Sequence, residues 1–222
     1  MTILTIAGTV QRRRRIWRLV RAGGVRYSAT MIELLTKPSM QKRALPLSVA
    51  AWHEMISKGL APERAELIRG VIIEKMSKSA LHYKLLKRLA RLLAKLDGFG
   101  FSVRQEGPLT FSDSEPEPDL AVVAGNDELM QGHPKTASLV IEVSVSTLSD
   151  DRDMALLYAQ AGVEEYWIIN AKGRCLEVYA QLQNGGYSLQ RSLPEGEVWN
   201  CTSLPDLSLD VAALFAGLTE AK

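Results

Sequence analysis

Two short runs of branched apolar side chains, each joined to a carboxylate, constrain the fold more than any other feature of the sequence. Residues 120–123 follow Asp119, and residues 139–141 precede Glu142. Both runs are bounded by turn-forming residues, which is typical of buried strands. Carboxylates are rarely buried unless they are paired or coordinate a ligand, so we expect these two acids to meet at one edge of a sheet. Such a pair suits a divalent cation, although an acid at a strand end is more commonly just solvated.

The remaining patterns predict an α/β domain with a mixed central β-sheet flanked by helices. Ser48 is a helix N-cap for a helix that ends near residue 58, and residues 66–76 predict two strands around a tight Arg69-Gly70 turn. The other expected elements are helices at 79–96, 151–161 and 211–215, strands at 101–111 and 165–170, and a hairpin around residues 184–186.

Charge divides the chain into two parts. Residues 1–44 carry ten Lys and Arg against the single acid Glu33, a net charge of +9, which leaves −7 for residues 45–222 because the whole chain is +2. We therefore expect a basic and disordered N-terminal extension over 1–44 and one folded domain over 45–222. The alternative for the extension is an arm that binds nucleic-acid phosphates.

The helix at 79–96 is amphipathic. Six leucines share one arc of about 120°, and basic side chains occupy the opposite arc. A solvated face explains such a pattern, and so does a row of cations along a DNA backbone. The candidate DNA-binding residues are Lys84, Arg88, Arg91 and Lys95. His82, on the apolar side, is read as a buried histidine with a hydrogen-bond partner or as a contact to a substrate phosphate.

The composition indicates no membrane span and no disulfide framework. Hydrophobic residues make up 46% of the chain and charged residues 23%, and no apolar run approaches the roughly 18 residues that a transmembrane helix needs. Cys175 and Cys201 are the only cysteines, and their wide spacing predicts neither a zinc site nor a stabilising bridge. We therefore expect a cytoplasmic protein.

The order of several motifs resembles one nuclease family. The chain is similar to the Uma-type restriction endonucleases of the PD-(D/E)XK nuclease superfamily over about residues 46–215. The motifs that carry this likeness are Glu66-Leu67-Ile68-Arg69-Gly70, Met76-Ser77 with His82 beyond, Glu115-Pro116-Glu117-Pro118-Asp119, Glu142-Val143-Ser144, Asp151-Arg152, Tyr158-Ala159-Gln160-Ala161-Gly162-Val163 and Glu165-Tyr166-Trp167.

The resemblance implies Mg²⁺-dependent, or Mn²⁺-dependent, hydrolysis of DNA phosphodiesters. Asp119 would be the acid of the PD motif, Glu142 the acid of the (D/E)XK motif, and Glu66 an acid supplied from the N-terminal part of the fold. The three are expected to converge as metal ligands, since Mg²⁺ prefers oxygen donors. Many nucleases of this fold act as dimers, which makes a homodimer possible by analogy.

One departure from the family pattern concerns the lysine. Ser144 stands two positions after Glu142, where the superfamily has lysine, and the following helix, where Uma-type members often carry it, has none at its start. Arg152 is the nearest substitute cation, although arginine does not act as a base. The alternative to an endonuclease is therefore a catalytically weak or inactive nuclease-fold domain that binds DNA or a protein partner.

Overall fold

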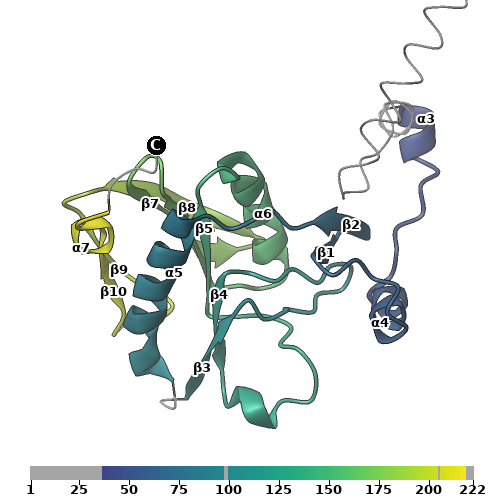
Figure 1. Cartoon of the computed structure of the whole chain (residues 1–222), viewed down its shortest axis with the longest axis horizontal. Coiled ribbons are helices and arrows are strands. Elements are labelled where there is room, and N and C mark those ends of the chain that lie inside the picture. The colour runs from purple at the N-terminus through teal and green to yellow at the C-terminus, as the bar shows by residue number, and fades with distance from the viewer. Residues whose placement is uncertain (1–36, 98–99, 205, 219–222) are drawn as a thin grey trace, which may run out of the picture. The chain divides into compact units, whose positions relative to one another are not determined.

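The central feature of the fold is a six-stranded mixed β-sheet (Figure 1). The computed structural model describes residues 37–97, 100–204 and 206–218. The sheet has the strand order β3-β4-β5-β6-β7-β8, in which only β5 and β6 are parallel and all other neighbours are antiparallel. The strands are β3 (Phe101–Gln105), β4 (Leu120–Ala124), β5 (Leu139–Ser144), β6 (Glu165–Asn170), β7 (Cys175–Gln183) and β8 (Gly186–Pro194).

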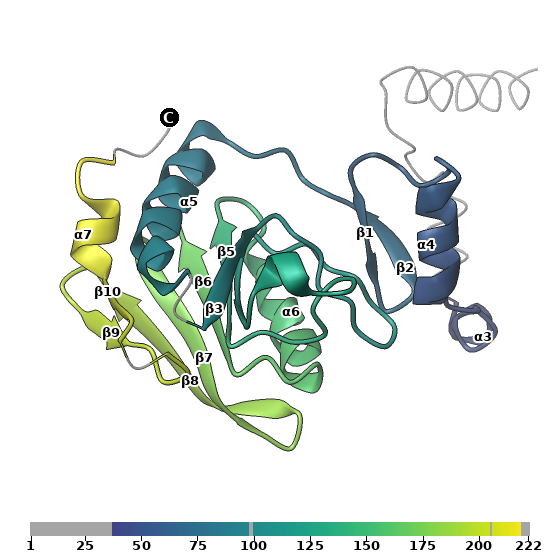
Figure 2. The same ribbon diagram turned by 90° about the horizontal axis from the view of Figure 1, so that it is seen from below.

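Each face of the sheet is covered by one long helix (Figure 2). Helix α5 (Ala80–Leu93), extended by a 3₁₀ turn at Ala94–Leu96, buries its leucine arc against one face, together with α7 (Val211–Phe215). Helix α6 (Leu148–Gln160) covers the other face, where Tyr158 and Tyr166 are fully buried. Because side chains alternate along a strand, Glu142 and Val140 of β5 point to the α6 side, and Ile141 and Val143 point to α5.

A small layer beside the sheet contains the first hairpin of the domain. Strands β1 (Ala65–Ile68) and β2 (Val71–Glu74) are antiparallel, and Arg69 and Gly70 in their turn have φ values of 49° and 74°. Both values lie in the left-handed region that two-residue hairpin turns require. Helix α4 (Val49–Ser57) packs Trp52 against this hairpin, and Ser48 caps the helix by accepting from the backbone N of Ala51 at 3.2 Å.

A second small sheet, β9 (Val198–Asn200) and β10 (Ser208–Asp210), joins α7 at the C-terminal end of the domain. Its link to the central sheet is Glu165, the first residue of β6, which is fully buried. One carboxylate oxygen accepts from the indole N–H groups of Trp167 and Trp199, both at 2.6 Å. The other accepts from Thr202 and from the backbone N of Ser203.

The α/β class with a mixed central sheet, predicted from the sequence, is confirmed. Helix α6 begins at Leu148, three residues before the expected start, and β3 lies within the range 101–111 that was expected to contain a strand. The predicted basic extension lies outside the described residues up to position 36. The described residues 37–46 lie outside the main compact unit and contain the short helix α3 (Pro38–Gln41). In the described part of the chain, no helix has the length and apolar character needed to cross a membrane.

Candidate functional site

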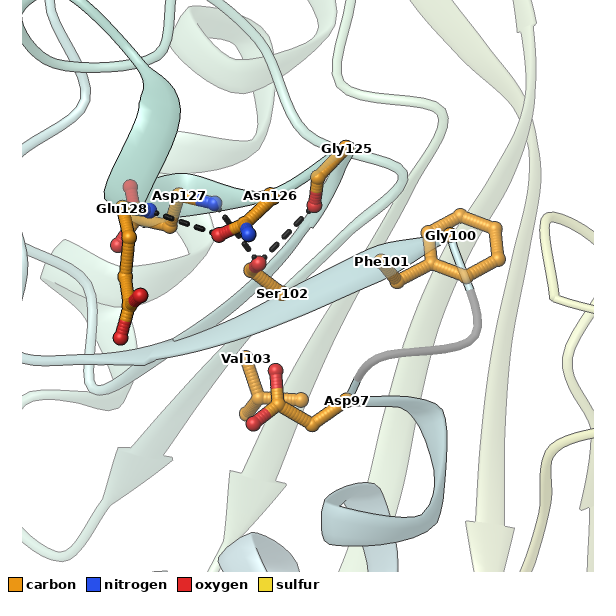
Figure 3. A pocket seen from close by; sticks show the side chains of 9 residues that line it. All are labelled: Asp97, Gly100, Phe101, Ser102, Val103, Gly125, Asn126, Asp127 and Glu128. Carbon is orange, nitrogen blue, oxygen red and sulfur yellow. Dashed lines mark hydrogen bonds between the residues drawn. The ribbon is translucent and has the colours of Figure 1, made fainter.

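The predicted acids line one cavity of roughly 490 Å³ between the hairpin, the start of α5, and the adjoining ends of β5 and α6. Glu66, Asp119 and Glu142 all border it, so the structure brings the three together. A cavity of roughly 600 Å³ lies at the other end of β3 and β4 (Figure 3). Its polar groups stabilise a turn, since Ser102 Oγ donates to the carbonyl of Gly125 and accepts from the backbone N of Asp127. We therefore place the candidate site in the first cavity.

The segment Glu115-Pro116-Glu117-Pro118-Asp119 runs between the two flanking acids. The prolines have no N–H, so the only backbone donors of this stretch are those of residues 115, 117 and 119. The N–H of Glu117 donates to Glu66 Oε2 at 3.1 Å, and that of Asp119 donates to Glu142 Oε2 at 3.2 Å. The backbone of the PD motif therefore fixes the positions of the other two acids.

Asp119 is the most tightly held acid of the cavity. Its Oδ2 accepts from the backbone N of Val143 and from His82 Nε2, both at 2.8 Å, and its Oδ1 accepts from Lys78 Nζ at 2.6 Å. Burial by itself would raise the pKa of Asp119, but the hydrogen bonds and positive charge of His82 and Lys78 outweigh it and lower the pKa. The ionised form of Asp119 is thus favoured, and His82 is a buried partner that positions it.

The other acids of the cavity have raised pKa values, in contrast to Asp119. Burial raises the pKa of Glu142 well above its ordinary value, and the negative charges of Asp119, Asp151 and Glu66 raise it further. Burial also raises the pKa of Glu66 and of Asp151. Tyr158 OH donates to Glu142 Oε1 at 3.0 Å. Four carboxyl groups therefore repel one another in a partly desolvated cavity, an arrangement typical of functional sites.

Two lysines that the sequence patterns did not single out lie among these acids. Lys78 Nζ contacts both Asp119 and Glu106, and Lys75 Nζ donates to Glu117 Oε2 at 2.6 Å. Burial would lower the pKa of Lys78, but its bonds to the two acids raise it, so the side chain stays protonated. Ser79 caps α5 by accepting from the backbone N of His82 at 3.2 Å, which places Lys78 directly before the N-terminus of the helix.

The arrangement of acids in the cavity agrees with the protein family that the chain matches. The family model described as "Uma2: Putative restriction endonuclease" matches residues 53–212. The chain belongs to this family. Uma2 membership, predicted from the motifs, is thereby confirmed, and nucleases of this family usually need a divalent metal. Among curated proteins, no relative matches the chain.

A solved structure supports the same fold. The crystal structure at 1.96 Å of a protein described as a "putative nuclease belonging to DUF820" from Anabaena variabilis ATCC 29413 superposes with a TM-score of 0.64 at 16% sequence identity. The match covers 77% of this chain and 98% of the other. The nuclease-like fold is therefore shared, although so low an identity does not carry residue roles from one protein to the other.

The structure of this Uma2 chain does not bring Arg152 to the acids. Arg152 Nε and Nη2 donate to the two oxygens of Glu177 on β7 at 2.8 and 2.7 Å, and Arg152 does not border the cavity. Ser144 is 2% exposed on β5, so its hydroxyl lies in packed surroundings. The sequence position of the missing lysine is thus occupied by a small buried residue, while Lys78 approaches Asp119 from another element.

The predicted DNA-binding residues of α5 separate into two kinds. Arg88 Nη1 donates to the carbonyl of Leu214 at 2.6 Å, and Lys95 Nζ donates to the carbonyl of Asp206 at 2.9 Å. These two cations stabilise the packing of the C-terminal segment on α5. Lys84 and Arg91 are exposed and have no hydrogen-bond or ion-pair partner in the described residues.

The chemistry of the cavity fits a divalent cation. Its carboxylate oxygens are the donors that Mg²⁺ and Mn²⁺ prefer, and a cation among them would relieve the repulsion that raises the pKa of Glu142. Within residues 37–97, 100–204 and 206–218, no three acidic, histidine or cysteine side chains are grouped closely enough to hold an ion as they stand. The donor set therefore fits, whereas the side chains would have to move to close around an ion.

Proposed function

We propose that the chain is an endonuclease that hydrolyses DNA phosphodiester bonds with Mg²⁺ or Mn²⁺ as cofactor. The observation that carries this proposal is that Asp119, the crowded acids around Glu142 and the ammonium group of Lys78 border one cavity. Family membership and the shared fold support it.

The acids of the cavity would hold the metal ion. Asp119, Glu142 and Glu66 are the proposed ligands, and Asp151 is a fourth candidate because its charge acts on Glu142. The ion supplies positive charge to the phosphoryl oxygens and lowers the pKa of a water molecule. Asp119 Oδ1 already accepts from Lys78, so an ion bound to this oxygen would share it with the lysine.

Lys78 takes the place that the family pattern gives to the missing lysine. Its side chain is 32% exposed, so a substrate phosphate can reach it. A protonated lysine beside the scissile phosphate would neutralise charge that develops during phosphoryl transfer. We assign this role to Lys78 in preference to Arg152, whose guanidinium is committed to Glu177. Because Lys78 also bonds Glu106, we expect slow cleavage.

The alternative is a nuclease-fold domain that binds DNA or a protein but cleaves poorly or not at all. It is favoured by the buried Ser144 and by the occupied oxygens of Asp119. The homodimer and the cytoplasmic location stay predictions.

Nicking of supercoiled plasmid decides between the two. The parent chain should convert the plasmid to open circles slowly in Mg²⁺ or Mn²⁺ and not in EDTA, and Asp119→Ala should reduce the rate by roughly 10²–10³-fold or more. Asp97→Ala, which removes an acid from the cavity of Figure 3, is the matched control and should keep the parent rate. A parent chain that does not nick in either metal, or an Asp119→Ala variant that nicks equally well, contradicts the endonuclease.

A further inference from the structure

The exposed side of α5 begins at the cavity and carries an aromatic ring. Tyr83 follows His82, whose side chain borders the cavity, and Tyr83 itself is 61% exposed. Lys87 Nζ lies 6.0 Å from the centre of the Tyr83 ring, on its face. A large aromatic side chain that remains this exposed on an otherwise well-packed helix has not been placed there by the core.

Basic side chains lie on the same side of α5 as Tyr83, and together these residues form a stripe along the helix. At 100° per residue, Tyr83, Lys87, Arg91 and Lys84 fall within an arc of about 100° on the helix surface. Lys84, Lys87 and Arg91 have no hydrogen-bond or ion-pair partner in the described residues, in contrast to the anchored Arg88. The stripe therefore offers free positive charge along a line that leads away from the cavity.

The hairpin side of the cavity presents exposed apolar side chains beside its charged residues. Ile73 of β2 and Met76 after it both line the cavity and are 42% and 64% exposed, and Met154 of α6 faces the same space. Phosphates bind donors and cations, so these side chains offer nothing to a phosphate. They suit bases and sugars, whose faces are hidden by stacking in a duplex and accessible in an unpaired strand.

We propose that the cavity and the exposed side of α5 bind an unpaired DNA strand, with a base stacked on Tyr83, which follows the cavity-lining His82, and the following phosphates beside Lys84, Lys87 and Arg91. The substrate class rests on the nuclease activity proposed above. Stacking platforms next to cationic tracks are the general means of holding a single strand, and the charge of the stripe is complementary to its backbone.

Binding to matched labelled oligonucleotides tests the substrate class. Fluorescence anisotropy in EDTA, where no cleavage occurs, compares a single strand with the duplex of the same sequence on the full chain. The single strand should bind about tenfold more tightly or better, Tyr83→Ala should remove roughly a factor of ten of that affinity, and Tyr83→Phe should keep it within about twofold. Lys87→Gln should weaken binding and make it less salt-dependent. Lys135→Gln, on the α6 side of the sheet, is the charge-matched control and should change nothing.

The outcomes separate this inference from the nuclease itself. A duplex that binds as tightly as the single strand, or a Tyr83→Ala variant that binds like the parent, overturns the inference even if plasmid is nicked. Polyglutamate that competes as well as unlabelled single strand also overturns it, because the stripe would then bind any polyanion. A chain that shows the expected binding but nicks no plasmid supports the strand-binding site and contradicts only the nuclease.

Discussion

Two glutamates of the paired strands β5 and β6, the fully buried Glu165 and the half-buried Glu142, have opposite surroundings. Glu165 is satisfied by five neutral donors from Trp167, Trp199, Thr202 and Ser203, and no ion pair to it is found among the described residues. Glu142 accepts two hydrogen bonds, borders a cavity and faces the charges of three other acids. A buried acid with all its bonds made stabilises the fold, whereas one that is left repelled in a cavity is available for a ligand.

Removing Glu165 should give the largest loss of stability. Glu165→Ala leaves the two buried indole N–H groups without an acceptor, each of which costs about 1–3 kcal/mol, and also removes the acceptor of three donors of Thr202 and Ser203. The free energy of unfolding should therefore fall by about 3 kcal/mol or more. Urea denaturation measures it. The adjacent, exposed Glu164→Ala is the control and should stay within about 0.5 kcal/mol of the parent. A loss below about 1 kcal/mol would remove the contrast between the two glutamates.

Replacing each of the two candidate cations with methionine should separate an effect on catalysis from an effect on stability. Lys78→Met should slow plasmid nicking by about 10²-fold, because it removes the only ammonium bonded to Asp119 within the described residues. Arg152→Met should leave the nicking rate within about twofold and lower the melting temperature, because Glu177 then loses its paired charge. The reverse pattern would return the catalytic role to Arg152.

Neutralising Glu142 should change stability less than removing Glu165 does, and it should stabilise the fold rather than destabilise it. The folded chain raises the pKa of Glu142 above its ordinary value of 4.5, so the folded state binds more protons than the unfolded state above that pH. The parent should therefore lose stability as the pH rises above about 4.5, and Glu142→Gln in EDTA should lose less. Melting temperatures of both chains across pH 4–8 measure this, with Glu164→Gln as the matched control. Parallel curves for parent and Glu142→Gln would show that the repulsion is absent.

Restoring the family lysine should have the smallest effect. Ser144 lies on the same face of β5 as Glu142 but is 2% exposed, so a lysine there must extend through packed surroundings. We expect Ser144→Lys to raise the nicking rate only a few-fold, with a fall in melting temperature. Ser146→Lys, on an exposed residue of the same cavity, is the comparison. No gain from Ser144→Lys when the parent also fails to nick would favour the binding domain.

The sequence predicted the sheet and the acids better than it predicted the cations. Buried strands are marked by local apolar runs between turn-forming residues, so β4, β5 and β6 were identified, while β9 and β10, at three residues each, were too short to show a pattern. Asp119, Glu142 and Glu66 followed from the family motifs, which fix sequence order. Long side chains have no such marker, because Lys78, Arg152 and Arg88 pair with residues 25 to 126 positions away. The cap at Ser79, four residues after Lys75, was the one local signal near the missed lysines.

The alternating prolines of the PD motif have a consequence for folding. Pro116 and Pro118 fix their own φ angles and restrict the residues before them to extended backbone, so this stretch has few conformations even in the unfolded chain. Little conformational entropy is then lost when the site forms, in contrast to a glycine-rich active-site loop. The backbone segment that donates hydrogen bonds to Glu66 and Glu142 is therefore largely restricted to extended conformations before the site forms.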